Sequence, residues 1–234
     1  MSPTVVHAPP RTPASEHHVD LAEESALLAC GHQLVGGVDE VGRGAWAGPL
    51  LVGVVVVDAR TGSAPVGTRD SKAIPPSRRR ELRPELESWC IAWALGEASA
   101  REIDARGLMK ALALATSRAL AALPLSPTAL IVDGPVDFLS ARLGRRGLPS
   151  IRDVRPIVGA DDLCASVAAA SILAKVARDA KMSALSRRFP HHGFEQHKGY
   201  GTRAHAQAVT AHGLTMHHRR SWKFAARDEA TVEY

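Results

Sequence analysis

Apolar residues along the chain form short runs that predict strands, and segments with helical spacing lie between them. The strand-like runs lie at 35–38, 50–57, 91–96, 129–132 and 152–158, and the run at 50–57 has the β-branched character of a buried strand. Helical spacing covers 20–30, 102–123, 162–181 and 202–212, and Pro124 ends the second of these segments. Three early strands followed by alternating helix and strand predict one α/β domain with a mixed sheet.

The helix predicted over 162–181 is rich in small side chains. Ala168, Ala169, Ala170 and Ser171 follow one another within it. Because the distance between packed elements depends on the side chains at the contact, this helix is expected to pack closely on its neighbour.

The composition of the 234 residues is that of a globular protein. With 45% hydrophobic and 23% charged residues the chain can bury a substantial core, which excludes a collagen, a disulfide miniprotein and a fully disordered chain. Lys and Arg (29) exceed Asp and Glu (24), which gives a net charge of +5. This excess permits a nucleic-acid partner, but a general bias toward arginine would also explain it.

Cysteine usage and hydropathy predict the compartment. Cys30, Cys90 and Cys164 are far apart and form no CxxC pair, so neither a disulfide framework nor a thiolate zinc site is predicted. The longest uncharged apolar stretch, 45–57, is too short to span a bilayer. Since the first residues also lack the pattern of a signal peptide, we expect a cytoplasmic protein with no membrane partner.

Acidic residues follow two of the predicted strands and precede one helix. Asp39 and Glu40 end the first strand, Asp133 ends the fourth, and Asp161 and Asp162 lie before the alanine-rich segment. Strand ends of an α/β sheet are where such folds place their sites. Converging carboxylates repel one another unless cations neutralise them, and hard, oxygen-preferring Mg²⁺ or Mn²⁺ suits such a site.

A pair of these ions is the usual machinery for in-line attack on a phosphodiester. The alternative is that each acid is a turn residue or a helix cap, and this alternative is strongest for Asp162.

A glycine-rich turn, Gly42-Arg43-Gly44, follows the first acidic pair. It lacks the spacing and the following helix of a dinucleotide-binding fingerprint. Glycine allows a backbone to approach a ligand closely, and Arg43 adds a charge directed at phosphate. A tight hairpin turn is the alternative, and both interpretations can hold at once.

Near the C-terminus, Tyr200 lies between two glycines, beside Lys198. A ring presented by flexible neighbours can stack on a sugar or a base, and the alternative is a loop tyrosine that packs back on the domain. Seven of the eleven histidines lie between 191 and 218 without HxxxH or HExxH spacing. They are interpreted as a solvated basic surface for phosphates, which continues through Arg219 and Arg220.

Six sequence blocks occur in an order that resembles one family, type 2 ribonuclease H (ribonuclease HII), over residues 33–224. The blocks are Gly37-Val-Asp-Glu-Val-Gly-Arg-Gly44 with Ala47-Gly-Pro49, Asp70-Ser-Lys72, Val132-Asp-Gly134, the segment 168–179, Gly193-Phe194 with His197-Lys-Gly-Tyr-Gly-Thr202, and His218-Arg-Arg-Ser221. Any one block is a weak signal, but six in order are highly specific.

The resemblance implies a ribonuclease H-like α/β fold, with a mixed five-stranded sheet flanked by helices and a C-terminal helical extension. The catalytic domain would cover 21–226, after a disordered leader at 1–20 and before a tail at 227–234.

The resemblance also implies a site for two divalent ions, Mg²⁺ or Mn²⁺. Its four metal-binding carboxylates, which would also be catalytic, fall on Asp39, Glu40, Asp133 and Asp161. The family's spacing to Ser171 selects Asp161 over Asp162.

The substrate-binding residues implied by the resemblance come from three blocks. The loop that contacts the ribose 2′-hydroxyl falls on Gly42, Arg43 and Gly44. The tyrosine that senses the junction, by packing on the following deoxyribose, falls on Tyr200. Phosphate contacts are expected from Lys72 and Lys175.

Three positions depart from the family's pattern, and none is a metal-ligand position. Pro135 follows the Asp-Gly pair, Ala73 follows Asp-Ser-Lys, and Trp222 follows Arg-Arg-Ser. The sister type 3 enzymes carry an added N-terminal domain. About 34 residues precede the first strand here and Tyr200 is present, so type 2 is favoured.

The implied function is an endonuclease that hydrolyses the RNA strand of RNA–DNA hybrids and cuts on the 5′ side of ribonucleotides embedded in duplex DNA. It would leave 3′-hydroxyl and 5′-phosphate ends and serve ribonucleotide and RNA-primer removal, as a monomer. The alternatives are another two-metal nuclease, such as a junction resolvase or an integrase-like enzyme, and a non-catalytic nucleic-acid binder.

Overall fold

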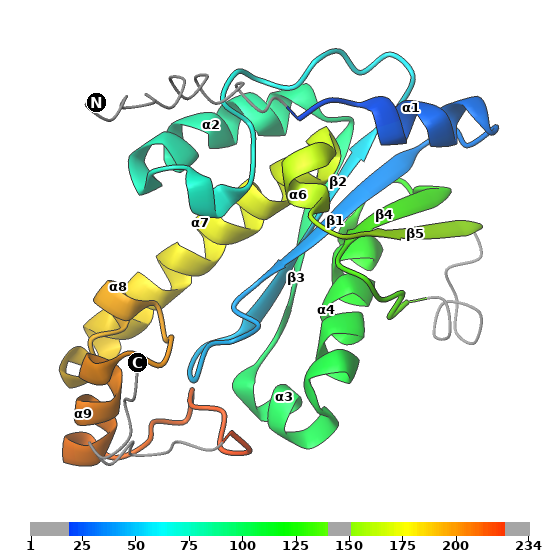
Figure 1. The fold of residues 1–234 in the computed structure, drawn as a ribbon. Helices are drawn as coiled ribbons and strands as arrows, with labels where there is room; N and C mark the ends of the chain where they lie inside the picture. The colour runs from blue at the N-terminus through cyan, green and yellow to red at the C-terminus, as the bar shows by residue number, and fades with distance from the viewer. Residues whose placement is uncertain (1–18, 140–150, 223–234) are drawn as a thin grey trace, which may run out of the picture.

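The computed structural model describes residues 19–139 and 151–222 and has a five-stranded mixed sheet at its centre (Figure 1). The strands lie in the order β3-β2-β1-β4-β5. The mixed five-stranded sheet expected from the sequence is confirmed. Its strands are β1 (Val35–Val41), β2 (Leu50–Val57), β3 (Ala92–Ala98), β4 (Ala129–Asp133) and β5 (Asp153–Ile157).

The central strand β1 joins an antiparallel half of the sheet to a parallel half. It pairs antiparallel with β2, which pairs antiparallel with β3. On its other side it runs parallel to β4, with Val38 opposite Val132, and β4 runs parallel to β5. Because β1, β4 and β5 run in the same direction, their carboxyl ends lie at one edge of the sheet.

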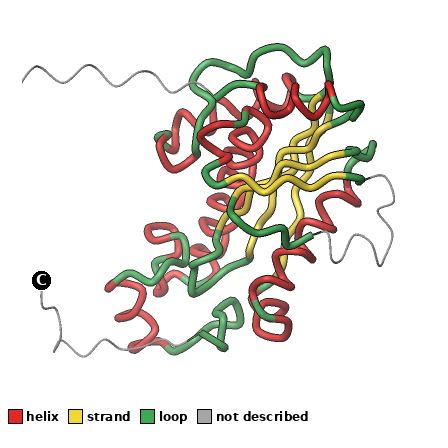
Figure 2. Tube along the Cα trace, turned by 45° about the vertical axis from the view of Figure 1, so that its right-hand side comes forward, coloured by secondary structure: helices red, strands yellow, loops and turns green. Residues whose placement is uncertain are grey.

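Helices cover both faces of this sheet (Figure 2), and the long helix α7 (Ala165–Arg188) crosses one of them (Figure 1). A Cβ atom on Gly37 of β1 would overlap the backbone of Ser166, and one on Gly53 of β2 would lie 2.5 Å from the carbonyl oxygen of Ala170. Larger residues would therefore push α7 away from the sheet. The close packing predicted for the small-residue helix is confirmed.

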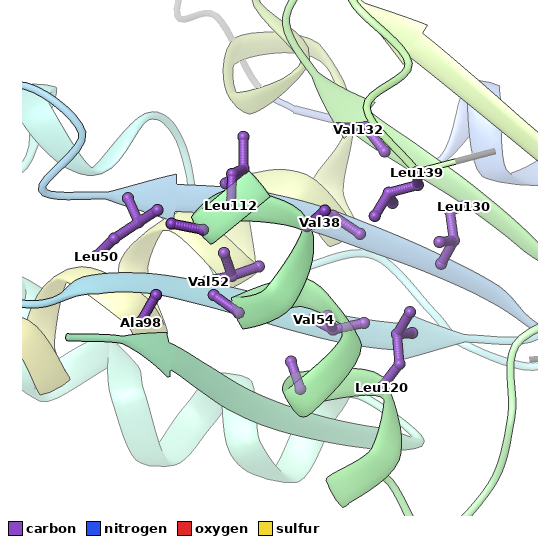
Figure 3. Close-up of a cluster of buried hydrophobic side chains, with 14 of the residues drawn as sticks. Val38, Leu50, Val52, Val54, Ala98, Leu112, Leu120, Leu130, Val132 and Leu139 are labelled. Atoms are coloured by element: carbon purple, nitrogen blue, oxygen red, sulfur yellow. The ribbon is translucent and has the colours of Figure 1, made fainter. Parts of the chain in front are cut away.

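The opposite face carries the largest apolar cluster, beneath α4 (Leu108–Ala122). Val52 and Val54 of β2 pack there with Leu112 and Leu120 of α4 (Figure 3). Val55, which follows Val54 in the strand, belongs to a separate cluster on the α7 side. Since strand side chains alternate between faces, β2 is buried on both, as its uninterrupted apolar run predicted.

Two predicted helices are each divided in the structure. The segment 102–123 forms α3 (Ala100–Arg106) and α4, because Gly107 adopts φ 76° and ends α3. The segment 162–181 begins as the short α6 (Ala160–Leu163) and resumes as α7 after Cys164, whose backbone is extended. The break at Cys164 separates the acidic pair from the long helix.

The apolar spacing along the chain does not predict α2 (Pro76–Trp89). This segment begins with Pro75-Pro76, contains Pro84, and is dominated by Arg and Glu, so its apolar periodicity is weak. Its buried Leu82 and Leu86 nonetheless pack in the cluster on the α7 side. The predicted helices at 20–30 and 202–212 are confirmed as α1 (Ala22–Ala29) and α9 (Arg203–His212), and α8 (Phe194–His197) is a further short helix.

Val19, the first described residue, is buried, and Asp20 forms a bridge with Cys164. The leader predicted at 1–20 lies outside the described residues up to residue 18, and so does the tail predicted at 227–234. Within 19–139 and 151–222, none of the helices combines the length and apolar character needed to cross a membrane.

Candidate active site

Carboxylates from three segments converge at the edge where β1, β4 and β5 end. Asp39 lies in β1, and Asp133 is the last residue of the adjacent β4. Asp161 is the second residue of α6, which follows β5. An Asp133 carboxylate oxygen accepts a hydrogen bond of 2.9 Å from the Ala160 backbone N–H, so it fixes the start of α6 beside β4.

The carboxylates act on one another electrostatically. The pKa of Asp39 is raised to about 8, first by burial and then by the charges of Glu40, Asp161 and Asp133, against a hydrogen bond from the Ser171 hydroxyl. Burial and the charge of Asp133 raise the pKa of Asp161 to about 6. Burial also raises the pKa of Glu40, to which Asp133 contributes. The structure therefore brings together all four carboxylates predicted from the sequence.

The two adjacent acids of α6 differ in their surroundings. Asp161 is 5% exposed, and its carboxylate lies 3.2 Å from the Lys72 ammonium. Asp162 is exposed at the surface of the helix. Of these two adjacent acids, Asp161 is the one that faces the other carboxylates, and it is also the one that the family's spacing selects.

Two basic side chains partly neutralise this acidic edge. Lys72 lies between Asp161 and Asp70, at 3.2 and 3.3 Å, and Arg43 lies 3.1 Å from Glu40. Burial lowers the pKa of Lys72, but the charges of Asp161 and Asp70 outweigh it and raise that pKa above its usual range. Lys72, which the family resemblance predicts to contact phosphate, thus lies at the acidic edge.

The donor set fits hard divalent cations, because every side chain in it offers carboxylate oxygens. In the arrangement described over 19–139 and 151–222, no three His, Cys, Asp or Glu side chains share one metal coordination sphere. Arg43 instead contacts the Glu40 carboxylate, and Lys72 contacts those of Asp161 and Asp70, through long side chains whose side-chain atoms are 53% and 77% exposed. Such side chains can move aside when a cation binds.

The turn that carries Lys72 is anchored to α7 and α2. The hydroxyls of Ser171 and Ser71 share a hydrogen bond of 2.9 Å, and Arg79 of α2 donates to the Ser71 carbonyl at 2.6 Å. Lys175, the other predicted phosphate contact, donates to Asp179 one turn further along α7 at 2.7 Å. Its side chain is 16% exposed, so the structure gives Lys175 a partner within its own helix.

Two buried arginines hold the glycine-rich turn in place. Arg219 donates to the carbonyls of Gly42 at 2.5 Å and of Arg43 at 2.7 Å. Gly42 has φ 88°, and a Cβ atom there would overlap Nε of Arg178. Both arginines are fully buried. The turn therefore directs these carbonyls toward the protein interior. Such an arrangement leaves the opposite face of the turn for a ligand.

Tyr200 lies beside the same turn. The Trp46 backbone N–H donates to the Gly199 carbonyl at 2.8 Å, and Ala45 forms a bridge with Tyr200. The Arg178 guanidinium lies 5.4 Å from the centre of the Tyr200 ring. Two segments more than 150 residues apart thus meet at one surface, and the structure brings together Gly42, Arg43, Gly44 and Tyr200 as the sequence predicted.

The interpretation of residues 191–218 as a solvated basic surface is wrong for several of its members. His192, His205, His218 and Arg219 are buried. Burial lowers the pKa of His205 and of His218 to about 4, so both are neutral near pH 7. These side chains hold the C-terminal segment together. No local pattern distinguishes them from surface cations, because their burial depends on distant segments.

Arg178 is the functional residue that sequence reasoning missed, although it lies within one of the family blocks. Its guanidinium donates to the carbonyls of Pro49, Lys198 and Ala47 at 3.0, 2.9 and 3.2 Å. It therefore joins the segment after the glycine-rich turn to the segment before Tyr200. The available signal was an arginine on the otherwise apolar face of a helix.

Comparisons with known proteins agree with this arrangement. The family model described as Ribonuclease HII matches residues 36–225. The chain is 44% identical to ribonuclease HII from Streptomyces coelicolor over 202 residues, covering 86% of this chain and 82% of that protein. Among solved structures, ribonuclease H2 from Pyrococcus horikoshii OT3 is similar with a TM-score of 0.68 and 30% identity, over 82% of this chain and 95% of that one.

The fold is also shared with Bst-RNase HIII in complex with Mn²⁺, with a TM-score of 0.57 and 24% identity. That similarity covers 77% of this chain and 63% of the other.

Proposed function

We propose a metal site for the reaction of this chain, which belongs to the ribonuclease HII family and is a metal-dependent endoribonuclease that cleaves RNA in RNA–DNA hybrids and at ribonucleotides embedded in DNA. Asp39, Glu40, Asp133 and Asp161 hold two divalent ions there, Mg²⁺ or Mn²⁺. The observation that carries the proposal is the buried Asp39 carboxyl, whose pKa is raised to about 8 beside three further acids.

The residues of the acidic edge have separate tasks. When bound, two divalent ions supply an activated water and stabilise the leaving 3′-oxygen. Asp39 and Glu40 hold the ligand oxygens on the rigid central strand, while Asp133 also keeps α6 and hence Asp161 in place. Lys72, already beside Asp161, is positioned to contact a phosphate of the cut strand. Cleavage on the 5′ side of the ribonucleotide leaves 3′-hydroxyl and 5′-phosphate ends.

Selection of RNA rests on the glycine-rich turn and on Tyr200. We infer that the outward-facing backbone of Gly42, Arg43 and Gly44 contacts the 2′-hydroxyl, because the carbonyls of Gly42 and Arg43 already accept hydrogen bonds from Arg219. A site built to bond a hydroxyl discriminates strongly against its absence. Tyr200, beside this turn, then packs on the following deoxyribose.

Cleavage of a labelled RNA strand in an RNA–DNA hybrid tests the proposed metal mechanism. With Mg²⁺ or Mn²⁺ we expect products that carry 3′-hydroxyl and 5′-phosphate ends, and with EDTA we expect no cleavage. Cleavage that survives EDTA would refute the mechanism, and so would 2′,3′-cyclic phosphate ends, which arise when the 2′-hydroxyl itself is the nucleophile.

Replacing Tyr200 by Ala is expected to lower kcat/KM for a DNA duplex with one ribonucleotide by about tenfold or more, because an aromatic stacking contact is worth about 1–3 kcal/mol. Tyr200→Phe keeps the ring and is expected to retain most of the activity. Steady-state kinetics of the three proteins on one substrate measure the difference. Equal rates for wild type and Tyr200→Ala would contradict the packing role.

The metal-free protein is expected to lose stability as the pH rises from about 6.5 to about 8, since below about 6.5 the low pKa values of His205 and His218 act in the opposite direction. Asp39 keeps its proton up to a pH of about 8 in the folded state but releases it near 4 when unfolded, so its contribution to stability is complete below pH 4 and lost as the pH passes 8. The raised pKa values of Glu40 and Asp161 act in the same direction.

Thermal melting in EDTA across this pH range measures the loss, and added Mg²⁺ is expected to raise the melting temperature more at pH 8 than at pH 6. Asp162→Asn is the matched control and should follow the wild type. A melting temperature that Mg²⁺ leaves unchanged at pH 8 would contradict the carboxylate assignment.

A further inference from the structure

Four histidines surround the buried ring of Phe194 beneath the Tyr200 loop. The rings of His197 and His205 stack with centres 4.1 Å apart and an angle of 15° between their planes. His192 and His218 lie 5.6 and 5.7 Å from the Phe194 ring centre. The proposed reaction uses none of these imidazoles, although they come from separate short segments and meet at one place.

The hydrogen bonds of His218 and His205 define which ring nitrogens carry protons. The Thr215 backbone N–H donates to Nδ1 of His218 at 2.9 Å, so this nitrogen has no proton. In a neutral imidazole the proton then lies on Nε2. Nε2 of His218 is 3.1 Å from Nε2 of His205, which must therefore accept. The remaining proton of His205 lies on Nδ1, 2.9 Å from the Tyr200 carbonyl oxygen.

The direction of this chain is fixed at both ends by backbone groups. A peptide N–H can only donate and a carbonyl can only accept, so the opposite tautomer of either ring would break two hydrogen bonds. A second proton on His205 would place two N–H groups face to face at 3.1 Å, and one on His218 would face the Thr215 N–H at 2.9 Å. Burial lowers the pKa of both rings to about 4, which keeps them neutral near pH 7.

His197 holds the loop on the other side of Tyr200. Nδ1 of His197 accepts from the Gly199 N–H at 3.1 Å, and its Nε2 lies 2.7 Å from the His192 carbonyl oxygen. The Tyr200 N–H donates to the His197 carbonyl at 2.9 Å. Both peptide groups of Tyr200 are thus tied to residues of the histidine cluster.

The loop needs such external support because glycine flanks Tyr200 on both sides. Gly199 adopts φ 83°, and a Cβ atom on Gly201 would overlap the Trp46 ring. Glycine has the greatest conformational freedom of all residues, so the chain at Tyr200 has little stiffness of its own. Its conformation depends on the groups that bond to its backbone.

We propose that His205 and His218 act as an ordered pair of positioning residues, which hold the Tyr200 backbone and thereby set the preference for a ribonucleotide followed by deoxyribose. This inference rests on the proposed role of Tyr200 in the reaction. The pair does not touch the carboxylates, so its loss affects the choice of substrate more than the bond cleavage itself.

Substitutions at His205 test the pair. His205→Phe keeps a ring against His197 but removes the donor to Tyr200, whereas His205→Gln restores a donor and an acceptor. We expect His205→Phe to lower kcat/KM about tenfold on a DNA duplex with one ribonucleotide and at most about threefold on a long RNA–DNA hybrid. His205→Gln should recover most of the loss. The matched control is His191→Phe, at an exposed histidine that stacks on His212.

An equal loss on both substrates would overturn the proposal, since it would show a purely structural role, and so would no loss on either. If His205→Phe does not fold, ¹⁵N NMR of the wild-type histidine side chains decides at pH 7. We expect His205 with its proton on Nδ1 and His218 with its proton on Nε2. The opposite tautomer at either ring, or a charged ring, would overturn the pair. A wild-type protein that cuts neither substrate would refute the proposed function, while the NMR result would still decide the pair.

Discussion

Replacing Asp39 by Asn is expected to abolish cleavage while making the metal-free protein more stable. Metal ions stabilise the transition state of such reactions by several kcal/mol, so loss of a central ligand should lower kcat by about 10³-fold or more. Asparagine cannot carry the charge that burial and three neighbouring acids disfavour. The metal-free melting temperature at pH 8 should therefore rise, and the gain on adding Mg²⁺ should shrink.

Asp162→Asn is the control, because Asp162 is adjacent to Asp161 but exposed. It should keep the wild-type rate, melting temperature and response to Mg²⁺. The assignment of Asp39 would be wrong if Asp39→Asn cleaved at the wild-type rate. A lower melting temperature of Asp39→Asn in EDTA at pH 8 would instead indicate a structural carboxylate.

Replacing Gly42 by Ala has the second largest expected effect. Gly42 has φ 88°, and an added Cβ would overlap Nε of Arg178, whose guanidinium holds the carbonyls of Pro49 and Lys198. Backbone strain and overpacking together should lower the free energy of unfolding by roughly 2–5 kcal/mol. Because we propose that the turn also positions the substrate, a displacement of about 1 Å should lower the rate by about 10²-fold.

Two other glycines separate the causes of this effect. A Cβ on Gly44 or on Gly62 meets no atom within 4 Å, and neither has a positive φ. Gly62→Ala, away from the site, should change neither stability nor rate. Gly44→Ala should keep the stability but weaken substrate binding, since we propose that its open side faces the substrate. Wild-type stability of Gly42→Ala, measured by denaturant unfolding, would contradict the close contact with Arg178.

The strand pattern and the acids that follow it predicted most of the sheet and three of the four carboxylates. The run at 50–57 predicts a strand by itself, because a strand buried on both faces is apolar throughout. Asp39 and Asp133 were placed correctly because parallel strands end at one edge. Asp161 was selected over Asp162 only through the family's spacing to Ser171, because the chain path through β5 and the turn at Gly159 determines which of two adjacent acids points inward.

What local sequence could not predict is which long polar side chains become buried. Arg219 is buried because it bonds to carbonyls of Gly42 and Arg43, more than 170 residues earlier in the chain. Its neighbours in sequence look like those of a surface arginine. His205 and His218 have nearer partners, which are backbone groups and each other, and no apolar spacing indicates that these rings are buried.

The predicted helix boundaries were wrong for a different reason. Gly107 ends α3 through its backbone conformation, but an apolar spacing that continues through it hides the break. In α2, burial of Leu82 and Leu86 against α7 outweighs a composition unfavourable for an amphipathic pattern.

Cleavage of a DNA duplex that contains one ribonucleotide tests the account most directly, because it requires both the acidic edge and the 2′-hydroxyl contact. With Mg²⁺ or Mn²⁺ we predict a single cut on the 5′ side of the ribonucleotide, with a 3′-hydroxyl and a 5′-phosphate at the new ends. The matching all-DNA duplex should be cut at least about 10³-fold more slowly. No cut by a folded protein, or equal cutting of both duplexes, would contradict the account.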